Sequence, residues 1–148
     1  MEVPAQFHFS HRRMVEFADT DLAGIVHFAN FFRYVESAEH AFFRSLGYRV
    51  HTESEGTHQG WPRIDVSCKY HKPARFEQTL EIGLRLAELR NSSLRYDFWI
   101  SVADERALLA TGSFSIIHVE IESGQIKKSP IPPTLREKLA ALLPAFSP

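Results

Sequence analysis

The spacing of apolar residues changes abruptly along this chain. Between Asn30 and Leu46 the apolar residues recur at steps of three and four, at Phe31, Tyr34, Val35, Ala38, Phe42 and Leu46. This spacing places them on one face of an α-helix. Asn30 is a candidate N-cap and Gly47 a candidate C′ residue, so both ends of a long helix are marked.

Beyond Pro62 the apolar residues occupy every second position, which is typical of β-strands. The alternation runs through three segments and is followed by a longer apolar run: 64–70, 80–86, 94–102 and 108–121. Upstream, alternate residues from Phe7 to Phe17 predict one more strand. Tyr48 to Gly60 is expected to connect elements, and Leu135 to Leu143 to form a short C-terminal helix. We therefore predict an α+β fold, in which a five-stranded antiparallel sheet wraps around one long central helix.

Length and charge limit the possible functions. The 148 residues suit one domain, expected to span 1–148. A net charge of -1 gives no general attraction to nucleic acid or to an anionic membrane, so neither is an expected partner. The N-terminus lacks a basic region followed by an apolar core, and the longest uncharged apolar stretch, Leu22 to Phe32, is too short to span a bilayer. We expect a cytoplasmic protein.

The sequence also argues against several kinds of catalytic site. Cys68 is the single cysteine, which excludes an intrachain disulfide and a four-cysteine metal site. None of the eight histidines belongs to a His-Glu-x-x-His pair, so no metal is expected. The serine-hydrolase elbow, the phosphate loop and the dinucleotide fingerprint are all missing.

An acidic turn precedes the predicted helix. Its sequence, Asp19-Thr20-Asp21-Leu22-Ala23-Gly24, lies between a strand end and the helix start. Gly24 allows the backbone to approach closely there, and a carboxylate held beside helix amides can act as a nucleophile or a base. Asp and Thr before a helix are also ordinary turn and capping residues, so the local pattern leaves a purely structural role open.

The segment from Val15 to Phe31 resembles the signature of the 4-hydroxybenzoyl-CoA thioesterase family of hot-dog proteins. The resemblance rests on Val15, Thr20-Asp21, Gly24-Ile25-Val26, Phe28 and Phe31, with Tyr34 one helical turn further on. It extends more loosely over 62–122 and implies a hot-dog fold. It also implies that Asp21 attacks the thioester or activates water, that His27 assists, and that the substrate is contacted by Gly24, Phe28, Asn30, Phe31 and Tyr34.

Some of these residues have a second interpretation. His27 near a helix start can be a structural bridge, and Asn30 and Tyr34 can serve as cap and core. Asp19 is expected to brace the turn while Asp21 reaches the pocket. Glu36 on the helix is the rival nucleophile, because a helical carboxylate is the catalyst in other hot-dog lineages.

The turn Arg90-Asn91-Ser92-Ser93 resembles the CoA-contacting turn of the same family. Arg90, Asn91 and Ser93 are therefore expected to contact CoA, which enters as part of the substrate; no separate cofactor is expected. Because the family commonly forms dimers that pair into tetramers, we expect a homodimer or homotetramer with CoA near the boundary between chains.

Together these expectations describe an acyl-CoA thioesterase that hydrolyses an aromatic or a short or branched acyl thioester to the free acid and CoA. One alternative is a 1,4-dihydroxy-2-naphthoyl-CoA hydrolase. Another is a non-catalytic module that binds acyl thioesters or an acyl carrier protein.

Overall fold

The computed structural model describes residues 2–54 and 56–143. The elements follow one another as β1 (Phe9–Met14), η1 (Phe17–Asp19), α1 (Asn30–Ser45), β2 (Thr52–Ser54), β3 (Thr57–Gly60), β4 (Arg63–Tyr70), β5 (Thr79–Leu89), β6 (Ser93–Val102), β7 (Ala107–Ile117), β8 (Val119–Glu122), β9 (Gln125–Lys128) and α2 (Pro133–Ala140). Among the described residues, no helix is long and apolar enough to cross a membrane.

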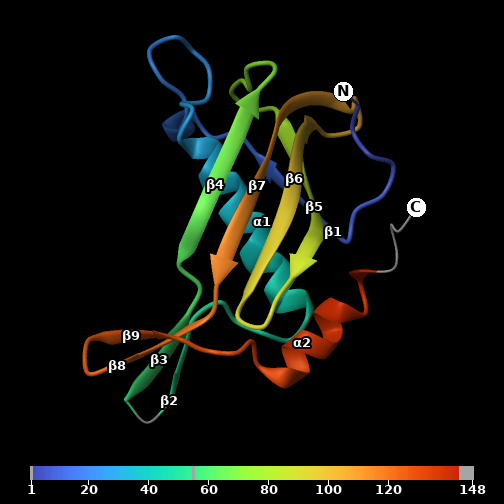
Figure 1. The fold of residues 1–148 in the computed structure, drawn as a ribbon. Coiled ribbons are helices and arrows are strands. Elements are labelled where there is room, and N and C mark those ends of the chain that lie inside the picture. Colours follow the sequence, from blue (N-terminus) through green and yellow to red (C-terminus); the bar gives the residue numbers. More distant parts are fainter. Residues whose placement is uncertain (1, 55, 144–148) are drawn as a thin grey trace.

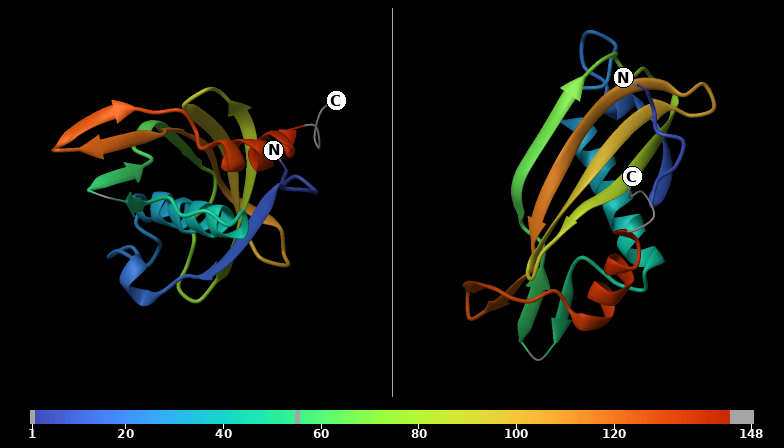
Figure 2. Two further views of the ribbon diagram at one scale, coloured as in Figure 1. Left: turned by 90° about the horizontal axis from the view of Figure 1, so that it is seen from below. Right: turned by 45° about the vertical axis from the view of Figure 1, so that its right-hand side comes forward.

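The larger sheet contains five strands in the order β1-β5-β6-β7-β4, and all neighbouring pairs are antiparallel. Figures 1 and 2 show α1 lying across one face of this sheet. Strands β5 and β6 present every second residue to the helix side, where Leu80, Ile82 and Leu84 are buried. The core therefore lies between α1 and the sheet, and the helix begins at one end of the sheet and ends at the other.

Helix α1 forms over almost the predicted range. Five residues of its predicted apolar stripe are buried and Leu46 is half-buried, while Phe43, beside the stripe, is buried too: the five are Phe31, Tyr34, Val35, Ala38 and Phe42. The prediction of its N-cap was wrong: the cap is Ala29, because the Asn30 side chain donates instead to the Asp19 carbonyl. At the other end Leu46 is the C-cap, and Gly47 follows it with a φ of +76°.

A second, four-stranded sheet, β2-β3-β8-β9, was not predicted. The segment from Tyr48 to Gly60, expected to connect elements, contains β2 and β3. The apolar run 108–121 is not one strand, because His118 separates β7 from β8 and its amide donates to the Ser92 carbonyl. Strands of three or four residues are too short to show a clear alternation in the sequence.

Two boundaries also differ from the prediction. Phe17 belongs to the 3₁₀ turn η1 rather than to a strand, because β1 ends at Met14. Helix α2 begins at Pro133, two residues before the predicted start, since proline fits the first helical turn.

Candidate active site

The acidic turn is closed by its own backbone. The amide of Asp21 donates to the Ile25 carbonyl at 2.9 Å, and the amide of Gly24 donates to the Asp21 carbonyl at 3.0 Å. Gly24 has a φ of +78°, a conformation that a residue with a Cβ adopts only with strain. The chain thus reverses within a few residues and carries the Asp21 side chain at the tip.

Asp19 braces this turn. Its Oδ2 atom accepts hydrogen bonds from the Glu16 amide and from the Tyr34 hydroxyl, both at 3.0 Å. Its carbonyl accepts from the His27 amide and from the Asn30 side chain, both at 2.9 Å. Asp19 therefore ties the turn to the start of α1, the bracing role expected for it.

Tyr34 anchors the brace from inside the core. The side chain is fully buried, and burial raises the pKa of its hydroxyl, as does the hydrogen bond to Asp19. The hydroxyl consequently stays protonated and acts as a permanent donor to the Asp19 carboxylate.

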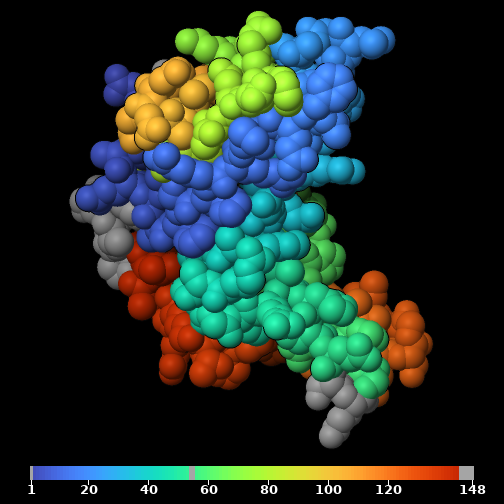
Figure 3. Space-filling model, turned by 180° about the vertical axis from the view of Figure 1, so that it is seen from behind, coloured from blue at the N-terminus to red at the C-terminus, as the bar shows by residue number. Residues whose placement is uncertain are grey.

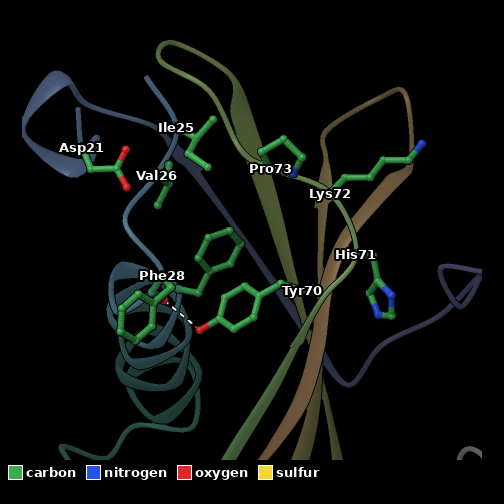
Figure 4. A pocket seen from close by; sticks show the side chains of 9 residues that line it. Asp21, Ile25, Val26, Phe28, Tyr70, His71, Lys72 and Pro73 are labelled. Atoms are coloured by element: carbon green, nitrogen blue, oxygen red, sulfur yellow. Dashed lines mark hydrogen bonds between the residues drawn. The ribbon is translucent and has the colours of Figure 1, made fainter. Parts of the chain in front are cut away.

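Asp21 lines a cavity of about 520 Å³ at the N-terminal end of α1. The other lining residues are Ile25, Val26, Phe28, Phe31, Tyr70, His71, Lys72 and Pro73 (Figure 4). The Oδ1 atom of Asp21 accepts from the Ala23 amide at 2.8 Å, and the described part of the chain offers no donor to Oδ2. A carboxylate oxygen is therefore available beside a largely apolar hollow.

Tyr70 closes the cavity opposite the helix start. Its hydroxyl donates to the Phe28 carbonyl at 2.9 Å, a bond drawn in Figure 4. Its ring meets Phe31 edge-on, with 5.1 Å between the ring centroids. Burial is the main reason that the pKa of Tyr70 is raised to about 12. Aromatic faces and a neutral phenol thus form much of the wall.

The structure gathers only some of the predicted substrate residues around Asp21. Phe28 and Phe31 line the cavity. Gly24 shapes the turn, Asn30 binds the Asp19 carbonyl and Tyr34 binds its carboxylate. None of these last three lines the cavity in the protomer.

His27 also lies outside the cavity lining. The side chain is exposed and its ring packs on Phe28, with 4.6 Å between the centroids. Its Nδ1 atom accepts a long hydrogen bond of 3.3 Å from the Ala29 amide. In the protomer this histidine therefore bridges the turn and the helix start.

Sequence reasoning did not place the far wall of the cavity, formed by Tyr70, His71, Lys72 and Pro73; of these, only Lys72 stood out in the sequence, as a basic residue near a strand end that could meet the CoA nucleotide. Tyr70 ends β4 and the other three residues follow it, and the chain after them pairs with the segment that follows the acidic turn: the Val26 amide donates to the Ala74 carbonyl at 2.9 Å. The proline after a strand signalled a turn, but nothing in the sequence indicated which distant segment it would meet.

The predicted CoA-contacting turn lies at the other end of the molecule, beside α2 (Figure 1). The Arg90 side chain donates to Glu88 at 2.7 Å, and its amide donates to the Ser93 carbonyl at 2.8 Å. The Asn91 carbonyl accepts from the Ile131 amide at 3.0 Å. Because a helix of 16 residues is roughly 24 Å long, one protomer does not bring this turn and Asp21 together.

The rival carboxylate, Glu36, is also away from the Asp21 cavity. Its Oε2 atom accepts from Arg63 at 3.0 Å, and Glu36 is not among the residues that line that cavity. Within the described ranges, no group of three or more His, Cys, Asp or Glu side chains is placed to hold a metal ion.

The chain is similar in sequence and in fold to known thioesterases. Residues 15–139 match the family model described as the thioesterase-like superfamily. The 1,4-dihydroxy-2-naphthoyl-CoA hydrolase of Synechococcus elongatus is 27% identical over 132 residues, which cover 88% of this chain and 94% of that protein. The acyl-CoA thioesterase YbgC of Helicobacter pylori is 27% identical over 128 residues, covering 86% and 93%. The crystal structure of Slr0204, a 1,4-dihydroxy-2-naphthoyl-CoA thioesterase from Synechocystis, superposes with a TM-score of 0.78 at 24% identity, over 90% of this chain and 96% of that one.

Proposed function

Since the chain belongs to the thioesterase-like superfamily, has its hot-dog fold and is a thioester hydrolase, we propose that it hydrolyses an acyl-CoA to a free acid and CoA, with Asp21 as the catalytic carboxylate. The observation that carries this proposal is the position of Asp21. Its Oδ2 atom has no donor among the described residues and lies beside an apolar cavity next to a helix start.

Two reaction routes fit this position. As a general base, Asp21 takes a proton from water while the water oxygen bonds to the thioester carbon; the carbon–sulfur bond then breaks and the CoA thiolate takes up a proton. As a nucleophile, the carboxylate displaces the thiolate and forms an anhydride, which water then hydrolyses. Both routes build negative charge on the thioester oxygen.

We look for the donor to that charge among the main-chain amides near the helix start. The amides of Asn30, Phe31 and Phe32 are occupied, because they donate to the carbonyls three residues earlier at 2.9, 3.3 and 3.2 Å. The Phe28 amide has no acceptor among the described residues and belongs to a residue that lines the cavity. It is our candidate for the oxyanion donor.

The wall of the cavity favours an aromatic or a short or branched acyl group. Phe28, Phe31 and Tyr70 offer aromatic faces, and the Tyr70 hydroxyl already donates to the Phe28 carbonyl. The relatives named for 1,4-dihydroxy-2-naphthoyl-CoA make that bicyclic aromatic thioester the alternative substrate.

We expect the complete site to need a second copy of the chain. Strand β4 is an edge of the larger sheet, and Ile64, Val66 and Tyr70 on it are 57%, 40% and 45% exposed. Antiparallel pairing of β4 with its copy would cover this edge. It would also bring the end of the partner that carries the CoA-contacting turn alongside the Asp21 end, so Arg90, Asn91 and Ser93 would serve the partner's cavity. This arrangement predicts a homodimer, or a homotetramer made of such dimers.

Thiol release from a panel of CoA esters tests the proposal. The panel contains benzoyl, phenylacetyl, 1,4-dihydroxy-2-naphthoyl and straight-chain thioesters. Asp21→Asn should lower turnover on the order of a hundredfold or more, because the amide keeps the shape of the side chain and can neither attack nor accept a proton. Asp19→Asn and Glu36→Gln are the matched carboxylate controls and should lose much less. Near-normal turnover by the Asp21 variant, or a greater loss in Glu36→Gln, would move the catalyst away from the turn.

A further inference from the structure

The outer face of α1 carries a row of basic side chains that the proposed reaction does not use. Arg33, Ser37, His40 and Arg44 follow one another at steps of four, three and four residues, which aligns them along one side of the helix. This side of α1 lies at the surface, on the face seen in Figure 3. Arg44 in the last helical turn is favoured by the helix dipole, whereas Arg33 in the first turn is not. Stability of the isolated helix therefore does not account for the row.

Strand β1 adds two more basic side chains beside this row. The Nε2 atom of His11 and the hydroxyl of Ser37 are 3.3 Å apart. The guanidinium of Arg13 lies over the Tyr34 ring, 5.1 Å from its centroid. Between the two elements is a polar hollow of about 520 Å³, separate from the Asp21 cavity and lined by Arg13, Arg33, Glu36, Ser37, His40 and Arg44. We call it the α1 hollow.

The positive charge in the α1 hollow is not neutralised within the described part of the chain. Arg13, Arg33 and Arg44 form no ion pair with a described carboxylate, and the one acid in the lining, Glu36, is paired with Arg63. The pKa of His11 is lowered, first by burial and then by the charges of Arg44 and Arg13. The charges of two guanidinium groups, those of Arg13 and Arg44, thus both act on the His11 ring, although the chain as a whole has a net charge of -1.

We propose that the α1 hollow binds a phosphorylated anion that carries at least two phosphoryl groups. Guanidinium groups match phosphate oxygens in geometry and charge, and three of them surround the hollow with a serine hydroxyl and a histidine between them. An adjoining hollow of about 330 Å³ shares His40 and Arg44 and adds Arg49 and His51, which gives room for the rest of a nucleotide.

A second copy of the chain is a poor occupant of the α1 hollow. A two-fold contact centred on it would place arginines against arginines, and like charges at close range are destabilising. The same phosphate chemistry has two possible sources: the nucleotide end of CoA in the substrate, or a free nucleotide that binds separately.

Calorimetric titration of the full chain with pyrophosphate at low salt tests the site directly, without reference to thioester hydrolysis. We expect saturable binding that weakens as salt is added. Arg33→Gln and Arg44→Gln should each weaken it by roughly tenfold or more, since each removes a charge-assisted hydrogen bond. Arg12→Gln is the matched control, because Arg12 is next to the hollow-lining Arg13 on β1 but pairs with Asp104 on the other side of the strand.

Three outcomes would overturn the proposal: no saturable binding by the wild-type protein, an equal loss in Arg12→Gln, or unchanged binding in both hollow variants. The native mass is measured in parallel by light scattering. A change of mass in the hollow variants together with no pyrophosphate binding would assign this face to a contact between copies instead.

Kinetics then separate the two sources of phosphate. If the nucleotide end of the substrate occupies the hollow, Arg33→Gln and Arg44→Gln raise KM for acyl-CoA but not for the matching acyl-pantetheine thioester, which lacks the nucleotide. If a separate nucleotide binds, KM for acyl-CoA is unchanged in the same variants, and pyrophosphate bound by the wild-type enzyme does not compete with acyl-CoA.

Discussion

Replacing Arg63 with Met should destabilise the protein strongly, because Arg63 compensates a buried charge. Glu39 on α1 is completely buried, and the Nη1 atom of Arg63 donates to both of its carboxylate oxygens, at 2.8 and 3.0 Å. The Tyr96 hydroxyl donates to the same carboxylate, and burial raises the pKa of Glu39. Methionine keeps most of the length of the arginine side chain but leaves Glu39 without its cation.

The size of the effect follows from the protonation of Glu39. Instead of keeping an unpaired buried charge, the variant can protonate this carboxyl. Protonating Glu39 at pH 7, when the ordinary pKa of a glutamate is 4.5, costs about 3 kcal/mol, at roughly 1.4 kcal/mol per pH unit. This agrees with the roughly 3–5 kcal/mol found when one partner of a buried ion pair is removed. For a chain of this size we expect the melting temperature to fall by roughly 7–14 °C.

Urea denaturation at pH 7 and pH 5 checks both the magnitude and its cause. In the variant the folded-state pKa of Glu39 is raised above its unfolded value, so stability is present at low pH and is lost as the pH rises. At pH 5 the protonation cost falls below about 1 kcal/mol, and most of the deficit should disappear. Glu39→Gln combined with Arg63→Met should remove this pH dependence.

Arg12→Met is the surface control for this experiment. The Arg12 and Asp104 side chains are 53% and 81% exposed, so breaking their ion pair should cost at most about 1 kcal/mol. An Arg63→Met deficit no larger than that of Arg12→Met, or one that is the same at both pH values, would refute the buried-charge argument.

Three further predictions concern the brace, the CoA site and a buried histidine. Tyr34→Phe removes the donor to Asp19. It should lower the free energy of unfolding, measured in urea, by about 1.5–3 kcal/mol and should also lower kcat. A loss of stability at unchanged kcat would contradict the link between the brace and Asp21. Arg90→Ala should raise KM for acyl-CoA more than it lowers kcat, because a phosphate contact exists in both the ground and transition states; an unchanged KM would remove Arg90 from the CoA site. His118 is buried, and burial lowers its pKa, so the stability that neutral His118 provides is lost as the pH falls below about 6.5. His118→Gln should therefore reduce the fall in melting temperature between pH 7 and pH 5. A fall as steep as that of the wild-type protein would count against this role.

The sequence contained most of the information needed for the larger sheet and for α1. Helix α1 is long enough for a 3.6-residue period to stand out, and β5 and β6 alternate over 11 and 10 residues. The four-stranded sheet escaped prediction because β2 and β3 are 3 and 4 residues long, and because β3 joins this local hairpin to the distant strand β8. Local periodicity carries no information about such distant pairing.

The residues of the candidate site also differ in how well the sequence predicts them: those close to Asp21 in the chain were predicted, and those from a distant segment were not. Phe28 and Phe31 were predicted because they belong to the same continuous segment as Asp21. Tyr70 and Pro73 were missed, since they reach the cavity through pairing of distant segments. The hydrogen bond from the Val26 amide, just after the acidic turn, to the Ala74 carbonyl, just after β4, shows this pairing. A single sequence does not reveal that contact.

Asp19 and Asp21 show what the structure adds to a distinction that the sequence analysis had already drawn between two neighbouring carboxylates. Both precede the helix, and spacing alone gives either one a claim to the chemistry. The Oδ2 atom of Asp19 accepts hydrogen bonds from the Glu16 amide and the Tyr34 hydroxyl, so a reaction at that oxygen would break the contacts that hold the turn. Asp21 has a single bond to Oδ1 from a neighbouring amide, and its Oδ2 atom has no donor among the described residues. The Oδ1 atom of Asp19 also has no donor among the described residues, so the cavity is what separates the two carboxylates: Asp21 lines it and Asp19 does not. These contacts favour a supporting role for Asp19 and support the proposal that Asp21 reacts.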